Sequence, residues 1–248
     1  MKIISIDIET TGVNPGTDQI VQVGAVAFDT SLQIFKPFLF EAIICHPRFE
    51  GQATALNMNI EKIVRSGGAY PIIKRKLEVF QGNWTNIPEM NVTNTSTVSV
   101  FAFPETLASQ LKTWLNEIGF DGDNTINIAG KNVAGFDLQF LCKLPEWYKN
   151  IRWRRRVLDP AILFVNDGDV CMPDLKECLT RAFGVDRPIA HTAAADALDV
   201  AKLLYLKLHH WEQGANMKQV SAAIDTFDEL NLLTNQNESL WENIKAQM

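Results

Sequence analysis

Several features are scarce in this sequence of 248 residues, and each scarcity excludes a class of protein. Its four cysteines show no paired CxxC spacing, so neither a zinc site nor a disulfide framework is indicated. No stretch approaches the ~20 apolar residues that span a bilayer, and we expect no membrane partner. Basic residues are not in excess either: the formal net charge is −6, which argues against binding nucleic acid through a broad basic surface.

The first residues also lack the pattern of a secretion signal. The segment MKIISIDIETTG carries one lysine and reaches acidic residues almost at once. We therefore expect a cytoplasmic protein with reduced thiols, and a bacterial or phage-infected cell is compatible with this expectation. The remaining composition, 46% hydrophobic and 21% charged, is that of an ordinary globular protein with one substantial core.

The order of the apolar patterns predicts an α/β fold with a mixed sheet. Strands are expected at 2–8, 20–29, within 34–45, at 98–103, at 125–130 and near 156–160. Helices are expected at 52–65, 104–119, 136–144, 175–184 and 193–211, the first of them ending at Gly67-Gly68. Strands that come first and then alternate with helices are typical of α/β domains.

The domain organisation follows from one polar stretch and from the end of the pattern. Residues 81–100 are rich in Asn and Thr, so we expect an insertion or long loop within about 66–103. Residues 1–212 are expected to form one domain. Residues 213–248 are expected to be a helical extension packed on that domain.

Two acidic residues interrupt the first apolar strand. Asp7 and Glu9 share one face of a strand, while Ile6 and Ile8 take the opposite face. Two carboxylates on one face repel each other unless a cation lies between them. For this pair alone, solvated acids at a strand end are the better interpretation, but the following Thr10-Thr11-Gly12 and a second apolar strand reverse that balance.

Three further titratable residues stand in two later segments. Asp137 follows Phe136 in a turn that leads into a helix, where an acid is also common merely as compensation of the helix dipole. Asp196 lies among alanines in a helix, with Asp199 one turn further on, and small neighbours let a helix approach a sheet closely. His191 comes just before this helix. Clustered with the acids of the first strand, these residues form an oxygen-rich set suited to Mg²⁺ or Mn²⁺.

The three segments together resemble the DEDDh-type 3′–5′ exonucleases of the ribonuclease H-like fold, which include polymerase proofreading subunits and phage-encoded relatives. The matching residues are Asp7-Ile8-Glu9-Thr10-Thr11-Gly12, then Asn132 with Phe136-Asp137, then His191 with Asp196. The subgroup with a tyrosine base is not matched, because Thr192 stands four residues before Asp196. Gln22 stands where relatives often carry Glu, and the interval between the first two motifs is long.

The resemblance implies a ribonuclease H-like sheet flanked by helices, and hydrolysis of phosphodiester bonds with two Mg²⁺ or Mn²⁺ ions. It implies that Asp7 bridges the ions, that Glu9 and Asp196 hold the ion beside the attacking water, and that Asp137 supports the other ion. His191 would take the proton from that water as general base. Two cations ~3.5–4 Å apart stabilise both the entering and the leaving oxygen in such a reaction.

The resemblance also implies a pocket for a free 3′ end, formed by Thr10, Thr11, Gly12, Met58, Asn59, Asn132 and Phe136. Backbone groups of residues 10–12 would lie near the terminal ribose and phosphate, and Asn59 near the sugar. Met58 would lie near the terminal base, and Phe136 would stack on a base. For Met58 and Phe136, packing in the core is an equally good interpretation.

Single-stranded nucleic acid with a free 3′ end is the expected partner, and single-stranded or frayed DNA is the preferred substrate. The basic run Arg152, Arg154, Arg155 and Arg156 either contacts phosphates or forms a solvated face. RNA trimming stays open, because nothing in the sequence decides how the 2′-OH is treated. A catalytically silent scaffold subunit is disfavoured, since it has no need of clustered carboxylates. A polymerase or another replication protein is a further candidate partner, through the tail from residue 213.

Overall fold

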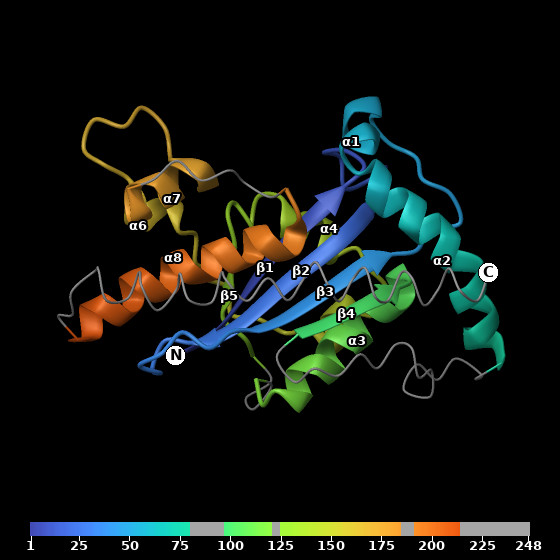
Figure 1. Cartoon of the computed structure of the whole chain (residues 1–248), viewed down its shortest axis with the longest axis horizontal. Helices are drawn as coiled ribbons and strands as arrows, with labels where there is room; N and C mark the ends of the chain where they lie inside the picture. The colour runs from blue at the N-terminus through green and yellow to red at the C-terminus, as the bar shows by residue number, and fades with distance from the viewer. Residues whose placement is uncertain (80–96, 121–124, 185–190, 214–248) are drawn as a thin grey trace.

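The fold is centred on one mixed sheet of five strands (Figure 1). A computed structural model describes residues 1–79, 97–120, 125–184 and 191–213. The strands are β1 (Lys2–Thr10), β2 (Ile20–Asp29), β3 (Phe38–Ile44), β4 (Thr97–Ala102) and β5 (Ile128–Ala129). Their order is β4-β3-β2-β1-β5, with β1 and β3 antiparallel to β2, and with β4 and β5 parallel to their neighbours. The predicted α/β class, a mixed sheet flanked by helices, is confirmed.

The described helices lie between these strands and after them along the chain. They are α1 (Ala53–Met58), α2 (Ile60–Val79), α3 (Pro104–Glu117), α4 (Asp137–Leu141), α5 (Trp147–Asn150), α6 (Ala161–Phe164), α7 (Leu175–Phe183) and α8 (Ala193–Gln213). Among these helices, none is both long and apolar enough to cross a membrane. The predicted helices at 104–119, 136–144, 175–184 and 193–211 correspond to α3, α4, α7 and α8, although α4 is shorter than expected.

Two apolar layers cover the two faces of the sheet. Ile4, Ile6 and Ile8 of β1 belong to a core cluster that includes Leu107 and Leu111 of α3. The preceding residue, Ile3, belongs instead to a second cluster that includes Leu203 and Leu204 of α8. The two-residue repeat of a strand therefore divides β1 between a face covered by α3 and a face covered by α8.

The face of the sheet on which α8 packs is apolar along one part of the strands and polar along the other. Its apolar part carries Ile3, Val26 and Phe28, which pack under α8. Its other part carries the side chains of Asp7, Glu9, Gln22, Glu41 and Ser99, which we call the polar patch. The strand register places these side chains next to one another across the strands, since Glu9 pairs with Gln22 and Glu41 pairs with Ser99.

The helix expected at 52–65 is different in the structure. It is divided into α1 and α2, and α2 continues through Gly67-Gly68 and past Pro71 to Val79. The expected end at Gly67-Gly68 is therefore wrong. Packing explains the difference, because Ala69 and Ile73 of α2 are buried in a cluster with Phe101, and such contacts override weak local propensity.

The strand expected at 125–130 is shorter than predicted. Only β5 and isolated bridges form there: Ile126 pairs with Trp153, and Ala129 pairs with Leu158. The strand expected near 156–160 is therefore a single bridge at Leu158. Part of the expected insertion belongs to α2 and β4, while residues 80–96 and the tail 214–248 lie outside the described residues.

Candidate functional site

Strand β1 carries the first two acids of the polar patch. Asp7 and Glu9 are half-buried, while Ile6 and Ile8, which alternate with them, are almost fully buried in the α3 layer. The expectation that the two carboxylates share a face is confirmed. This face is the one on which α8 begins.

The beginning of α8 lies directly on β2, because Gly24 has no side chain. A Cβ at Gly24 would lie 2.3 Å from the carbonyl of Ala193 and from the nitrogen of Ala194. Gly24 is also the cross-strand partner of Asp7. The close approach therefore sets the first turn of α8, which carries Asp196, beside the acids of β1.

Three carboxylates meet at this point. One oxygen each of Asp7, Glu9 and Asp196 lies within 4.8 Å of the other two. Asp137, the first residue of α4, adjoins this set: it is 3% exposed, and its Oδ1 accepts the backbone N–H of Ile8 at 3.0 Å. The structure thus brings together the four acids that the sequence analysis singled out as metal ligands.

Burial and mutual repulsion raise the pKa values of these carboxyls. The pKa of Asp7 lies well above its ordinary value, first because of burial and then because of the charges of Asp137, Asp196 and Glu9. Burial, with smaller contributions from neighbouring acids, raises the pKa of Asp137 and of Asp196 to about 7. The pKa of Glu9 is raised by burial as well. The site therefore favours any cation that offsets this negative charge.

The donor set fits a divalent metal ion. Oδ1 of Asp196 is buried and has no hydrogen-bond partner among the described residues. An uncompensated oxygen beside other carboxylates is costly in a folded protein. Carboxylate oxygens are the ligands that Mg²⁺ and Mn²⁺ prefer, so these residues suit the predicted ions.

His191 lies at the edge of the acidic set. It is exposed and adopts a left-handed backbone conformation with φ of 50° immediately before α8. The imidazole is near enough to Glu9 that a positive charge on it would lower the pKa of that carboxylate. The Nζ of Lys62 donates to the carbonyl oxygen of His191 at 3.2 Å.

Lys62 is a site residue that the sequence analysis missed. Its charge lowers the pKa of both Glu9 and Asp196, and its Nζ donates to Oδ1 of Asn59 at 3.1 Å. Asn59, in turn, is buried and donates to the carbonyl of Thr10 at 3.1 Å. A single lysine in a helix carries no motif, and only its spacing of three residues from Asn59 could have indicated it.

The turn after β1 uses its hydroxyl groups internally. Thr10 donates to the carbonyl of Gly12 at 2.6 Å, and Thr11 donates to the carbonyl of Glu50 at 2.7 Å. Gly12 lies close to Asp18, since a Cβ there would lie 2.2 Å from the carboxylate of Asp18, which would have to move. A nucleotide near this turn would therefore meet backbone groups rather than free hydroxyls, as the prediction for residues 10–12 assumes.

The other expected substrate contacts have three different environments. Met58, at the end of α1, is 63% exposed, so packing in the core does not account for it. Phe136 is half-buried and packs against Phe140 with ring centroids 5.2 Å apart. Asn132 is exposed, with φ of 53°, and its backbone N–H donates to Asp159 at 2.8 Å. Their contacts with a substrate stay predictions.

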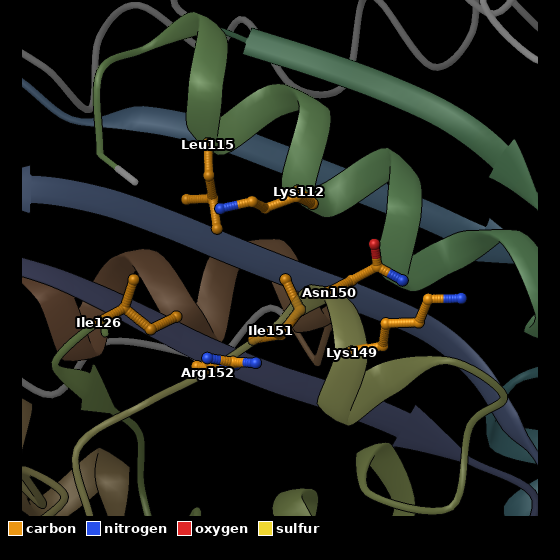
Figure 2. A pocket seen from close by; sticks show the side chains of 7 residues that line it. All are labelled: Lys112, Leu115, Ile126, Lys149, Asn150, Ile151 and Arg152. Carbon is orange, nitrogen blue, oxygen red and sulfur yellow. The ribbon is translucent and has the colours of Figure 1, made fainter. Parts of the chain in front are cut away.

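A cavity of about 210 Å³ lies away from the acids, between α3 and the segment around α5 (Figure 2). Its lining consists of Lys112, Leu115, Ile126, Lys149, Asn150, Ile151 and Arg152. This lining has three cations and no acid, so it is unsuited to a divalent metal ion. Lys149 is paired with Glu146 at 2.6 Å. The four arginines of the basic run are exposed, and only Arg152 lines this cavity.

Comparison with known proteins gives structural rather than sequence likenesses. No protein-family model and no curated protein sequence matches the chain. The fold is similar to that of exonuclease I of E. coli in complex with a 5cy-dT13 oligonucleotide, at 15% identity and a TM-score of 0.48 over 86% of this chain. A second exonuclease I structure gives 16% identity and a TM-score of 0.49 over 91% of this chain.

The catalytic unit of Neurospora crassa Pan2, which contains protease and nuclease domains, is also similar. It gives 14% identity and a TM-score of 0.44 over 89% of this chain. The chain spans 41% or 42% of the exonuclease I chains and 29% of the Pan2 chain.

Proposed function

We propose that this protein is a divalent-metal-dependent 3′–5′ exonuclease that hydrolyses single-stranded DNA or frayed 3′ ends. The observation that carries the proposal is the convergence of Asp7, Glu9 and Asp196 within 4.8 Å, with Asp137 beside them. These acids belong to segments whose order and joint occurrence resemble the DEDDh exonucleases. The direction and the substrate come from that resemblance.

Two Mg²⁺ or Mn²⁺ ions are the proposed cofactors, held by Asp7, Glu9, Asp137 and Asp196. When bound, such ions stabilise the negative charge that grows on the attacking and leaving oxygens of the phosphodiester. The carboxylates are set by rigid elements, β1, α4 and the first turn of α8, and their burial strengthens the interaction with a cation.

His191 is the proposed general base, which takes the proton from the attacking water. Its exposure allows that proton to pass to solvent afterwards. Its position just before α8 ties it to Asp196, which lies on the same helix. A general base of this kind typically contributes ~10²–10⁴-fold to the rate.

The terminal nucleotide is proposed to lie between the turn at residues 10–12 and the end of α1. Backbone groups of the turn would contact its ribose and phosphate. Met58 supports this role, because an exposed apolar side chain at a helix end offers a surface to a base. Asn59, Asn132 and Phe136 complete the proposed binding residues.

The direct test uses 3′-labelled and 5′-labelled oligomers of DNA and RNA, with Mg²⁺ or with EDTA. Stepwise shortening from the 3′ end that EDTA abolishes is the expected result. A single internal cut would indicate an endonuclease instead. Faster shortening of RNA than of DNA would assign the protein to RNA trimming.

The matched control is Asp7→Asn, which keeps the size of the side chain and removes its charge. No hydrolysis by either protein, together with tight binding of the oligomers, would indicate a catalytically silent binding subunit and contradict the proposal.

A further inference from the structure

A buried amide connects the polar patch with the beginning of α8. Gln22 of β2 is 3% exposed. Its Oε1 accepts the backbone N–H of Ala193 at 3.2 Å, and its Nε2 donates to Oε1 of Glu41. One side chain therefore bridges the middle of the sheet and the first residue of the helix that carries Asp196.

Glu41 determines which way this amide points. It is 5% exposed, and its second oxygen accepts the hydroxyl of Ser99 at 3.4 Å. A carboxylate accepts hydrogen bonds and does not donate them, so the NH₂ of Gln22 faces Glu41. The carbonyl oxygen of Gln22 then faces Ala193, whose N–H requires an acceptor.

The N–H of Ala193 needs such a partner because it lies in the first turn of α8. The first N–H groups of a helix have no acceptor within the helix and are satisfied from outside. Here the acceptor comes from a strand, and it acts between the two functional residues: His191 lies two positions before Ala193, and Asp196 lies three positions after it.

The uncharged nature of Gln22 also fits its place. Gln22 is the cross-strand partner of Glu9, and Glu41 is its hydrogen-bond partner. A carboxylate at position 22 would add a further negative charge between these two acids. An amide supplies the acceptor for Ala193 without adding repulsion to the site.

We infer that Gln22, oriented by Glu41, is a positioning residue that holds the beginning of α8 and thereby sets Asp196 and His191 against Asp7 and Glu9. Its effect on catalysis rests on the proposed function, whereas its effect on metal binding does not. Residues that orient metal ligands typically change metal affinity or activity ~10–100-fold when they are replaced.

The test is Gln22→Met, which keeps the length of the side chain and removes both hydrogen bonds. Titration with Mn²⁺ alone, without nucleic acid, should show an affinity ~10-fold or more below that of the parent chain. Hydrogen exchange should become faster in the peptide that contains Ala193. With an oligonucleotide substrate, kcat should fall while KM stays the same.

Rescue by an exchanged pair makes the test specific. The double variant Gln22→Glu with Glu41→Gln keeps one carboxylate and one amide, and the carboxylate at position 22 can still accept from Ala193 while the amide at position 41 donates to it. Most of the lost Mn²⁺ affinity should return. Gln22→Glu alone should not restore it, because two carboxylates then face each other.

Ser66→Ala is the matched control. Ser66 is fully buried and donates to the carbonyl of Ile44 in β3 at 2.9 Å rather than to α8, so its loss should cost stability without changing Mn²⁺ affinity. Equal Mn²⁺ affinity and equal kcat for Gln22→Met and the parent would overturn the inference.

Absence of nuclease activity in the parent would contradict the proposed function, while the Mn²⁺ and exchange measurements would still decide the role of Gln22. If Gln22→Met does not fold, Glu41→Gln provides the same comparison, with a smaller expected loss.

Discussion

Two sets of buried carboxylates lie on the same face of the sheet and are compensated in different ways. Glu41 is surrounded by donors, since Gln22 and Ser99 donate to it and the charges of Arg65 and Lys62 lower its pKa against the larger effect of burial. Asp7, Glu9 and Asp196 face one another instead, and Oδ1 of Asp196 has no hydrogen-bond partner among the described residues. We call these three acids the uncompensated set, because the charge of Lys62 offsets only part of the effect of burial on Glu9 and Asp196. Burial raises the pKa in both sets, so a raised pKa alone does not distinguish a binding site from a structural acid. The hydrogen-bond donors around the carboxylate distinguish the two. We call Glu41, with its donors Gln22 and Ser99, the compensated set.

The largest expected effect comes from removing one acid of the uncompensated set. Asp7→Asn should lower the rate of hydrolysis by more than ~10⁴-fold, because losing a metal ligand reduces the rate more than losing a general base does. The same variant should be more stable than the parent in EDTA, since one of the repelling charges is gone. Activity assays and thermal unfolding check both parts. Parent-like hydrolysis under saturating Mg²⁺ would contradict the assignment of the site.

His191→Ala should have the next largest effect. It should lower kcat by ~10²–10⁴-fold while the Mn²⁺ affinity stays close to that of the parent, because His191 lies beside the carboxylates without belonging to the three that converge. Kinetics and Mn²⁺ titration measure the two quantities separately. A loss of Mn²⁺ affinity as large as the loss of kcat would make His191 a ligand rather than a base.

The stability of the metal-free protein should depend on pH through the carboxyls of the site whose pKa values are raised. The pKa values of Asp137 and Asp196 rise from 3.8 to about 7 on folding, so between these values the folded protein holds protons that the unfolded chain releases. The contribution of these two groups to the free energy of unfolding is therefore greatest below pH 3.8, and it falls as the pH rises to about 7.

Mg²⁺ should oppose this fall, and more at pH 8 than at pH 5. At 100 times its Kd it adds ~2.7 kcal/mol to the free energy of unfolding. Thermal unfolding in EDTA and in Mg²⁺ across this pH range measures both effects. The same Mg²⁺ effect at both pH values would show that the ion binds elsewhere.

Gly24 lies between the two sets, as cross-strand partner of both Asp7 and Glu41. Gly24→Ala should displace α8 and cost ~1–3 kcal/mol of stability, the usual range for an overpacked core, together with Mn²⁺ affinity. Gly67→Ala is the control, because a Cβ there meets nothing within 4 Å. It should stabilise α2 by up to ~1 kcal/mol and leave Mn²⁺ affinity unchanged. Chemical denaturation of both variants makes the comparison.

The smallest expected effect belongs to the compensated set. Ser99→Ala removes one donor to Glu41 and should cost ~1 kcal/mol of stability, with Mn²⁺ affinity unchanged because Gln22 and the cations still hold the carboxylate. Denaturation and Mn²⁺ titration test this. A fall in Mn²⁺ affinity comparable to that of Gln22→Met would show that the two sets act as one.

Local patterns were sufficient to predict the central strands and the first acids. The two-residue alternation around Asp7 and Glu9 predicts both the strand and the shared face, and the structure has both. Asp137 and Asp196 were identified through motif order, because an acid in the first turn of a helix has no distinctive pattern of its own. The close approach of α8 follows from Gly24, whose role depends on a contact with residue 193 that no local pattern contains.

The compensated set could not be predicted for the same reason. Glu41, Gln22 and Ser99 come from three strands, and their contacts depend on the strand register, which the sequence leaves open. The continuation of α2 beyond Gly67-Gly68 depends on burial against β4. Lys62 belongs to the site only because α2 passes beside the beginning of α8.

The last described helix has a consequence for synthesis of the chain. Asp7 and Glu9 leave the ribosome well before His191 and Asp196, which follow almost two hundred residues later. A nascent or truncated polypeptide that stops before α8 therefore lacks the proposed general base and one of the proposed ligands. In a nuclease, this delay would protect surrounding nucleic acids until translation has passed α8 and the helix has docked on β2.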